Sequence, residues 1–391
     1  MLGDLEKLSF ATKQDSETGV TVRRLSDGKG DTITPYFTQP MVSHDNRHVL
    51  VESTRTSQHQ LHLIDLEDET MLQVTSEPDI GFHRSLMDIN RMVAYHWAGR
   101  LLRRVDLTTL RSEALYEIPE GFRGGILSID HSGRYLAFVY AEQLNVSTAT
   151  GQIYSDMKEK YYRRPSCVII RYDIEKRRAE AVWGEHEWIS HVAISPVDPD
   201  LVLFCHEGPW ARLHRMWVVR VSSGEHWPLV ERENFTEKDG HEYFTHAGKV
   251  VTQYASRESS ASNEWDEYNL CIWPDGTGEE RFALGPRRPG HVQTSHTDDT
   301  LLVGDGSFPM GGPDEEEWRS KGHGYMALLR HQEGVAHIKP LCTHNTSWST
   351  QNSHPHPVFA PNDDSIFFNS DAEGLSNVYQ ALDIKRYAEG L

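Results

Sequence analysis

One turn pattern recurs along the whole chain, and this repetition restricts the fold more than any other feature. Each copy has a strand-like hydrophobic run, a short polar turn and a second strand-like run, as in residues 129–134 (IDHSGR) followed by 135–138 (YLAF). The copies are spaced by roughly 40 to 60 residues, which is the period of a four-stranded propeller blade. The sequence therefore predicts an all-β, seven-bladed β-propeller that forms a single domain over residues 1–391, with blades at 36–78, 81–120, 123–186, 189–232, 238–285, 290–345 and 351–384.

The last unit lacks one strand, because too few residues follow Phe359 to complete a blade. The strand-like run GVTVRRLS, which begins at Gly19, precedes the first complete unit. We expect residues 19–27 to supply the missing strand, since this closure removes the exposed edges of an open ring. The alternative is that residues 1–35 form a mobile arm.

Composition narrows the class of protein further. A chain of 391 residues with 38% hydrophobic residues can bury a large core. The net charge of −19 disfavours nucleic acid and anionic membranes as partners, because the summed field repels phosphate. The chain begins without the features of a signal peptide and has no run of membrane-spanning length, so we expect a cytoplasmic protein. The cysteines are far apart and lack metal-type spacing, which predicts buried free thiols at Cys167, Cys205, Cys271 and Cys342.

Histidines recur at one register of the repeat. When the units are aligned on the turn, four histidines stand three residues before the position of Phe359, and His291 stands one residue earlier still. Equivalent positions of different blades surround one axis, so these side chains should converge although they are distant in sequence. Hydrophobic cores have no use for repeated imidazoles, so the pattern predicts a functional face. The four are His83, His191, His241 and His356.

A metal site is predicted near the C-terminus, in the segment TQNSHPHP at residues 350–357. In an extended strand His354 and His356 lie on the same side, and imidazole and amide groups such as that of Gln351 both bind metal ions. A Pro-stiffened loop with two surface histidines is the alternative, because a short H-x-H pattern is weakly specific. His291 would complete a set of three histidines and one glutamine around a divalent ion. His296, which we expect to face outward, is the alternative third histidine.

The chain resembles the oligogalacturonate lyases nearly end to end, through residues 205–210 (CHEGPW), 215–217 (RMW), 240–243 (GHEY) and the predicted metal set. These lyases are cytoplasmic seven-bladed propellers that cleave short oligogalacturonides by β-elimination with Mn²⁺. The identity of the metal follows from the resemblance alone. The resemblance implies four metal ligands, namely His291, Gln351, His354 and His356. It also implies that His241 is the base and that Arg215 lies at the reacting sugar.

The chemistry of such an elimination explains these residue types. The reaction removes a weakly acidic C5 proton beside a carboxylate, and a divalent ion on that carboxylate stabilises the enolate-like intermediate. Arg215 could add a fixed positive charge near the same group. His241, with an unperturbed pKa of about 6.5, is a competent base, and nearby cations should favour its neutral form.

Other candidate residues have two interpretations each. His83, Arg84 and His191 could bind a further carboxylate of the substrate, or His83 and Arg84 could simply order a loop. Arg215 could instead form a salt bridge with Glu207 or Glu242. The basic run 158–164 (KEKYYRR) could form a rim that contacts acidic sugars or a solvated hairpin tip.

Two other functional classes compete with a lyase that acts on a small acidic oligosaccharide. A non-catalytic propeller would use the ring as a docking surface and would need neither a metal set nor a separate base. A metal-dependent hydrolase would need a water nucleophile and an acid, for which Asp305 or Glu242 could serve. The sequence does not separate galacturonate from other uronates, since all carry the carboxylate that the metal would bind.

Overall fold

The computed structural model describes residues 1–147, 155–231, 235–285, 289–306 and 324–391. The protein is all-β and is built from several mainly antiparallel sheets, as the repeats predict. The acidic segment 311–317, for which the sequence suggests an exposed loop, lies outside the described residues.

The first half of the chain contains the strands β1 (Leu5–Lys7), β2 (Ala11–Gln14), β3 (Thr21–Arg24), β4 (Thr32–Ile33), β5 (His48–Ser53), β6 (Gln60–Asp65), β7 (Thr70–Gln73), β8 (Ile80–Asp88), β9 (Val93–Ala98), β10 (Leu101–Asp106), β11 (Ser112–Glu117), β12 (Phe122–Ile129), β13 (Tyr135–Glu142), β14 (Cys167–Asp173) and β15 (Arg178–Glu185).

The second half contains β16 (Ile189–Ile194), β17 (Leu201–His206), β18 (Met216–Arg220), β19 (His226–Pro228), β20 (Glu237–Phe244), β21 (Val250–Ser256), β22 (Asp266–Ile272), β23 (Glu280–Ala283), β24 (Val292–Thr294), β25 (Leu301–Gly304), β26 (Tyr325–Gln332), β27 (Val335–Thr343), β28 (Val358–Phe359), β29 (Ser365–Ser370) and β30 (Asn377–Leu382). The short helices are α1 (Met157–Arg163), η1 (Trp210–Arg212), η2 (Gln351–Ser353) and α3 (Ile384–Ala388).

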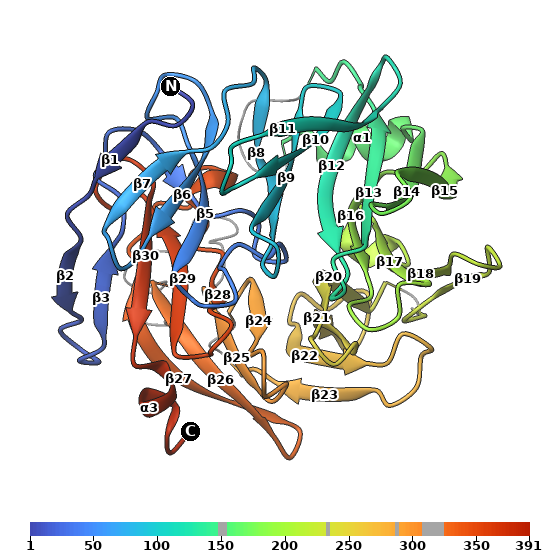
Figure 1. Cartoon of the computed structure of the whole chain (residues 1–391). Coiled ribbons are helices and arrows are strands. Elements are labelled where there is room, and N and C mark those ends of the chain that lie inside the picture. Colours follow the sequence, from blue (N-terminus) through green and yellow to red (C-terminus); the bar gives the residue numbers. More distant parts are fainter. Residues whose placement is uncertain (148–154, 232–234, 286–288, 307–323) are drawn as a thin grey trace.

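The described strands form six sheets, which lie side by side around a common centre (Figure 1). Three sheets are four-stranded meanders, namely β8 to β11, β12 to β15 and β16 to β19. The largest sheet has eight strands and consists of two such meanders, β20 to β23 and β24 to β27. A single parallel pair, Ala283 with Val335, joins those two meanders. Strands β12, β16, β20, β24 and β28 lie nearest the centre (Figure 1).

The two ends of the chain meet in one sheet, whose order is β2-β3-β30-β29-β28. Strand β3, within the segment 19–27, pairs antiparallel with β30, and Val22 lies opposite Ala381. Residues before β3 are also strands rather than a free arm, because β2 pairs with β3 and β1 pairs with β7 of the first sheet. The N-terminal residues therefore extend two sheets by an outer strand.

The inner strands are interrupted by register shifts at equivalent places. Pairing shifts between Ile80 and Ser85 in β8, and bulges in which two residues face one on the partner strand recur in β12, β16 and β20. His83, His191 and His241 all lie within these shifts. His83 and His241 have φ angles of 58° and 55°, a left-handed conformation that is uncommon outside glycine. A bulge re-aims side chains locally, so these histidines depart from the simple in-out alternation of a strand.

Aromatic packing joins neighbouring sheets. Trp97 of β9 meets Phe138 of β13 edge to face, with ring centroids 5.2 Å apart, and its indole nitrogen donates a hydrogen bond to the carbonyl of Gly125. A Cβ at Gly124 would lie 2.3 Å from the Trp97 ring, so only glycine permits this approach. Such contacts bury the apolar faces that each small sheet could not bury alone.

The basic run 158–164 does not form a hairpin tip. Most of it belongs to helix α1, which ends at Arg163, while Arg164 adopts a left-handed cap conformation. All four cysteines are buried free thiols, as the sequence predicts. In the parts of the chain that the structure describes, no helix is long and apolar enough to cross a membrane.

Candidate metal centre and active site

Three histidines from two segments meet near the centre of the molecule. His291 immediately precedes β24, and His354 and His356 lie between η2 and β28. One ring nitrogen from each lies within 4.8 Å of the others. The exposed fraction is 3% for His291, 3% for His354 and 0% for His356. The three side chains are therefore close enough to share one ion.

Asp305 orients His291. Asp305 follows β25, and His291 precedes β24. Because Val292 pairs with Gly304, Asp305 and His291 lie opposite each other at the end of the β24–β25 hairpin. The Oδ2 atom of Asp305 lies 2.7 Å from Nδ1 of His291, and its Oδ1 accepts a hydrogen bond of 2.8 Å from the His291 backbone. The buried Nε2 of His291 has no hydrogen-bond partner within the described chain. A carboxylate behind one ring nitrogen and a free second nitrogen is the usual arrangement of a metal-binding histidine.

Gln351 completes the predicted set. Its side-chain amide nitrogen lies 3.5 Å from Nε2 of His356, and since the nitrogen and oxygen of an amide are interchangeable by rotation, the oxygen can face the same space. Thr350 and Ser353 close a capping box that fixes the short helix η2, which carries Gln351. The structure thus brings His291, Gln351, His354 and His356 together.

Burial keeps the imidazoles of the cluster neutral. Loss of water contact lowers the pKa of His291 to about 3, and it lowers the pKa of His354 and His356 well below the usual value. Repulsion between the neighbouring rings acts in the same direction. Neutral imidazole is the form that binds metal ions, so the cluster fits a divalent cation.

His241 lies beside this cluster, and the centroid of its ring is 4.2 Å from that of His291. The structure thereby brings the predicted base next to the predicted metal ligands. Burial lowers the pKa of His241 to about 3, and repulsion from His291 adds to this effect. The sequence predicts a neutral imidazole here, but desolvation contributes more to that state than neighbouring cations do.

The environment of His241 also selects its tautomer. Its Nδ1 lies 2.6 Å from Oε1 of Gln253, and the amide nitrogen of Gln253 donates to the carbonyl of Pro289. Because an amide oxygen only accepts, Nδ1 of His241 carries the hydrogen and Nε2 carries the lone pair. Gln253 was not anticipated from the sequence. Gln253 lies opposite Gly240, the residue before His241, in the pairing of β20 with β21, and only this pairing could have indicated its role.

Arg215 is buried between two carboxylates. Its Nη1 lies 2.8 Å from Glu207, and its Nε lies 2.8 Å from Glu242. The salt-bridge interpretation of Arg215 therefore describes its contacts, and both glutamates take part. Glu242 also accepts from Nδ1 of His191 at 3.2 Å. His191, Cys205 and Glu242 form a second group of potential ligand atoms, but the Arg215 guanidinium already occupies the Glu242 carboxylate.

A cavity of about 760 Å³ opens next to the histidine cluster. His83, Arg84 and His191, the predicted substrate-binding residues, all line it. His83 connects the cavity to the cluster, because its ring meets His356 edge to face with centroids 5.0 Å apart. A volume of this size is typical of small-molecule sites.

Tyr36 lies among the histidines and was not identified from the sequence. Its ring centroid is 4.9 Å from that of His356, 5.6 Å from that of His191 and 5.9 Å from that of His83. Tyr36 belongs to a loop after β4 and does not recur in the repeat, so the alignment of units could not reveal it.

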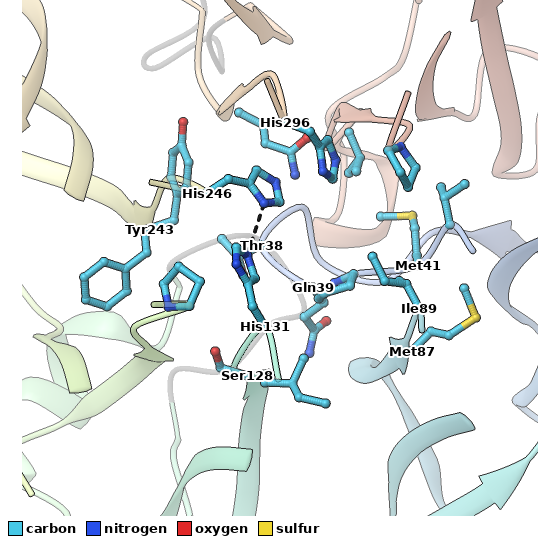
Figure 2. Close-up of a pocket in the computed structure, with 18 of the residues that line it drawn as sticks. Thr38, Gln39, Met41, Met87, Ile89, Ser128, His131, Tyr243, His246 and His296 are labelled. Atoms are coloured by element: carbon cyan, nitrogen blue, oxygen red, sulfur yellow. Dashed lines mark hydrogen bonds between the residues drawn. The ribbon is translucent and has the colours of Figure 1, made fainter. Parts of the chain in front are cut away.

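His296 belongs to a separate cavity of about 440 Å³, which Figure 2 shows. The ring of His296 stacks on that of His246 with centroids 3.9 Å apart, and His246 contacts His131 at 3.2 Å between ring nitrogens. The expectation that His296 faces outward is thus wrong in detail, since it lines this cavity. It is not part of the three-histidine group.

These features define an all-β protein with a buried histidine centre of the metal-binding type in the middle of a ring of sheets. The chain belongs to the oligogalacturonate lyase family, whose model matches residues 2–384.

Individual relatives support this assignment. The chain is 28% identical to an oligogalacturonide lyase of Pectobacterium atrosepticum over 388 residues, which is 97% of each protein. A crystal structure of an oligogalacturonate lyase from Vibrio parahaemolyticus is 25% identical, has a TM-score of 0.85, and is matched over 99% of this chain and 100% of its own. A structure described as oligogalacturonate lyase in complex with manganese is 24% identical, also has a TM-score of 0.85, and is matched over 99% of both chains.

Proposed function

We propose that this protein is a lyase that cleaves short oligogalacturonides, such as digalacturonate, by metal-assisted β-elimination. The observation that carries the proposal is the neutral His241 ring, fixed in one tautomer, beside three buried histidines that can share an ion. A β-elimination needs such a pair of functions, because one group must withdraw charge from the carboxylate while another removes the C5 proton. Family membership gives the substrate class.

The proposed ligands of the ion are His291, Gln351, His354 and His356. Mn²⁺ is the proposed ion, because a relative of the same fold is described in complex with manganese. When bound, a divalent ion would neutralise the C6 carboxylate of the reacting sugar and act as a Lewis acid. Asp305 would hold the His291 ring in the orientation that this binding requires.

His241 is the proposed base. Its Nε2 would take the C5 proton, the electrons of the C5–H bond would form the C4–C5 double bond, and the C4–O bond would break. The departing oxygen would take one proton from solvent, and His241 would later return its own to solvent. With a pKa of about 3, His241 is unprotonated throughout the neutral range. We therefore do not expect activity to rise through titration of this residue between about pH 5 and 8, in contrast to a base with an ordinary imidazole pKa.

Arg215 is proposed to act mainly by positioning. Two glutamates already neutralise its charge, so the predicted role as a bare cation at the sugar is weakened. Through Glu242, however, Arg215 fixes His191, which lines the cavity together with His83 and Arg84. We propose that His83, Arg84 and His191 bind the substrate there.

The alternatives are less well supported. A hydrolase would use Asp305 or Glu242 on water, but Asp305 is engaged with His291, and Glu242 with Arg215 and His191. A non-catalytic scaffold would have no need for the buried histidine centre. Incubating the purified protein with digalacturonate and Mn²⁺ separates the three, because only elimination yields an unsaturated product that absorbs in the ultraviolet. Saturated products would indicate hydrolysis, and unchanged substrate would contradict both enzymatic functions.

We also propose that the sheets are the seven blades of a β-propeller. The eight-stranded sheet would then be two blades, since one residue pair alone links its halves. Residues 19–27 would complete the last blade through β3, and the other blade limits would follow the repeats. We also propose a cytoplasmic location. All four cysteines are free thiols, and thiols stay reduced in the cytoplasm, whereas oxidising compartments favour disulfides.

A further inference from the structure

Two arginines converge on the wall of the cavity next to the histidine cluster. Arg84 of β8 and Arg123 of β12 both line this cavity, although they come from neighbouring sheets. Within the described chain neither side chain has an ion pair or a side-chain hydrogen bond to a carboxylate. Burial lowers the pKa of Arg84 most, and the positive charge of the nearby Arg123 lowers it further. Asp79 and Glu52 attract the charge of Arg84, but neither forms an ion pair with it, and two adjacent cations without a directly contacting counter-ion favour an anion that joins them.

Gly81 makes room for this pair. A Cβ at this position would lie 3.0 Å from Cδ of Arg84 and 3.7 Å from Nη2 of Arg123. Both guanidinium-bearing side chains therefore pass over one glycine. The register shift in β8 between Ile80 and Ser85 further allows the consecutive residues His83 and Arg84 to line the same cavity. The local backbone thus places the His83 ring and the charged Arg84 side chain at the same cavity.

Two of the carboxylates near the cavity, Glu52 and Glu142, are engaged in hydrogen bonds to other groups. Glu52, which lies behind β8, accepts hydrogen bonds from the His83 backbone at 2.6 Å and from the Ser85 hydroxyl at 2.5 Å. Glu142 lines the cavity, but its Oε2 accepts from the backbone of Ser166 at 3.2 Å. Neither carboxylate forms an ion pair with the two arginines.

A third cation, on helix α1, also lies at this cavity. Lys160 of α1 also lines the cavity, and its Nζ lies 2.6 Å from Asp156 and 5.0 Å from the centroid of the Trp188 ring. Trp188 lines the cavity as well. An aromatic surface beside cations suits a sugar that carries a negative charge, because the ring can contact the sugar face while the cations meet the carboxylate.

We propose that Arg84 and Arg123 bind the carboxylate of the uronate that is not attacked, adjacent to the one whose carboxylate would reach the metal centre. This inference rests on the proposed function. His83 places the arginine pair next to that centre, because it contacts His356 and lines the cavity. The enzyme would therefore recognise two neighbouring free carboxylates, and Arg123, which sequence reasoning did not select, would be a specificity-determining residue.

The test compares Arg84→Gln and Arg123→Gln with a matched control, Arg178→Gln, whose side chain is exposed on the outer strand β15. The substrates are digalacturonate and digalacturonate methylated on the uronate that is not attacked. We expect each cavity variant to raise KM for digalacturonate about 10- to 100-fold with a smaller change in kcat, since one charge-assisted contact is lost. The control should match the wild type.

The ester distinguishes a carboxylate contact from a general effect. The wild type should discriminate against the ester, and Arg84→Gln and Arg123→Gln should lose most of that discrimination. Gly81→Ala should give a smaller loss of the same kind without any change in charge, because its Cβ would push against the Arg84 side chain. Unchanged KM and unchanged discrimination in both arginine variants would overturn the inference while the wild type remains a lyase. Absence of unsaturated product from the wild type would instead overturn the proposed function.

Discussion

Nδ1 of His241 and Oε1 of Gln253 are 2.6 Å apart, and this contact determines which nitrogen of His241 can accept a proton. We expect Gln253→Leu, which removes the acceptor and keeps the volume similar, to lower kcat about 10- to 100-fold, the range found when partners that orient a functional histidine are lost. KM and bound Mn²⁺ should change little. Steady-state kinetics together with metal analysis check this, and an unchanged kcat would mean that tautomer control is not limiting.

Replacement of the base itself should have a larger effect. His241→Ala is expected to lower kcat by about 10² to 10⁴, because proton removal occurs in the transition state and the other substrate contacts remain. The variant should still contain Mn²⁺ and bind digalacturonate, as measured by elemental analysis and calorimetry. Activity within about threefold of the wild type would exclude His241 as the base.

The sequence predicts the all-β class and the convergence of the histidines because both follow from the repeat. His83, His191 and His241 share one register, and in the structure they share the bulged part of an inner strand. Contacts that depend on the pairing of particular strands or on loops were not accessible. Asp305 reaches His291 through a hairpin register, and Tyr36 reaches the cluster from a loop with no counterpart in other units.

Charge pairing was also hidden from the sequence. Arg215 could be read as a free cation or as part of a salt bridge, and only the fold shows that Glu207 and Glu242 both contact it. The same limit applied to Arg123, which is ordinary in sequence and becomes notable because Arg84 lies beside it across two sheets.

The metal centre can be tested residue by residue. His354→Ala and His356→Ala should each lose Mn²⁺ and activity without unfolding the protein, because the sheets do not depend on this loop. Asp305→Asn should weaken metal affinity about 10- to 100-fold, since the partner that orients His291 is altered. His296→Ala is the control and should retain the metal. Elemental analysis after dialysis decides, and loss of the ion from the His296 variant alone would move the site.

The Arg215 cluster should contribute to stability as well as to activity. Arg215→Met would leave Glu207 and Glu242 buried without their cation, and breaking a buried ion pair typically costs about 3–5 kcal/mol. We expect the urea midpoint to fall accordingly. Changing Glu207 and Glu242 to Gln in the same variant should restore part of the loss. A midpoint equal to that of the wild type would show that the network does not stabilise the fold.

Glu52 should make the stability of the protein depend on pH. The residue is fully buried, and desolvation raises its pKa from 4.5 to about 7. Between these values the folded state keeps a proton that the unfolded state has released, so stability falls as pH rises. Glu52→Gln imitates the protonated form and should remove this loss. The decrease in unfolding free energy from about pH 5 to 8 should therefore be smaller than in the wild type by about 2–3 kcal/mol.

Urea unfolding at the two pH values measures this difference, and Glu258→Gln, at an exposed position, controls for the loss of one negative charge. The effect has a direct link to the cavity, because Glu52 accepts the backbone hydrogen bond of His83, next to Arg84. If Glu52 binds its proton as weakly in the folded chain as in the unfolded one, the wild type and Glu52→Gln will show parallel pH profiles. A carboxylate that stays charged at this depth would then be stabilised by the hydrogen bonds from Ser85 and the His83 backbone together with the charge of Arg84, and KM for digalacturonate would change in Glu52→Gln.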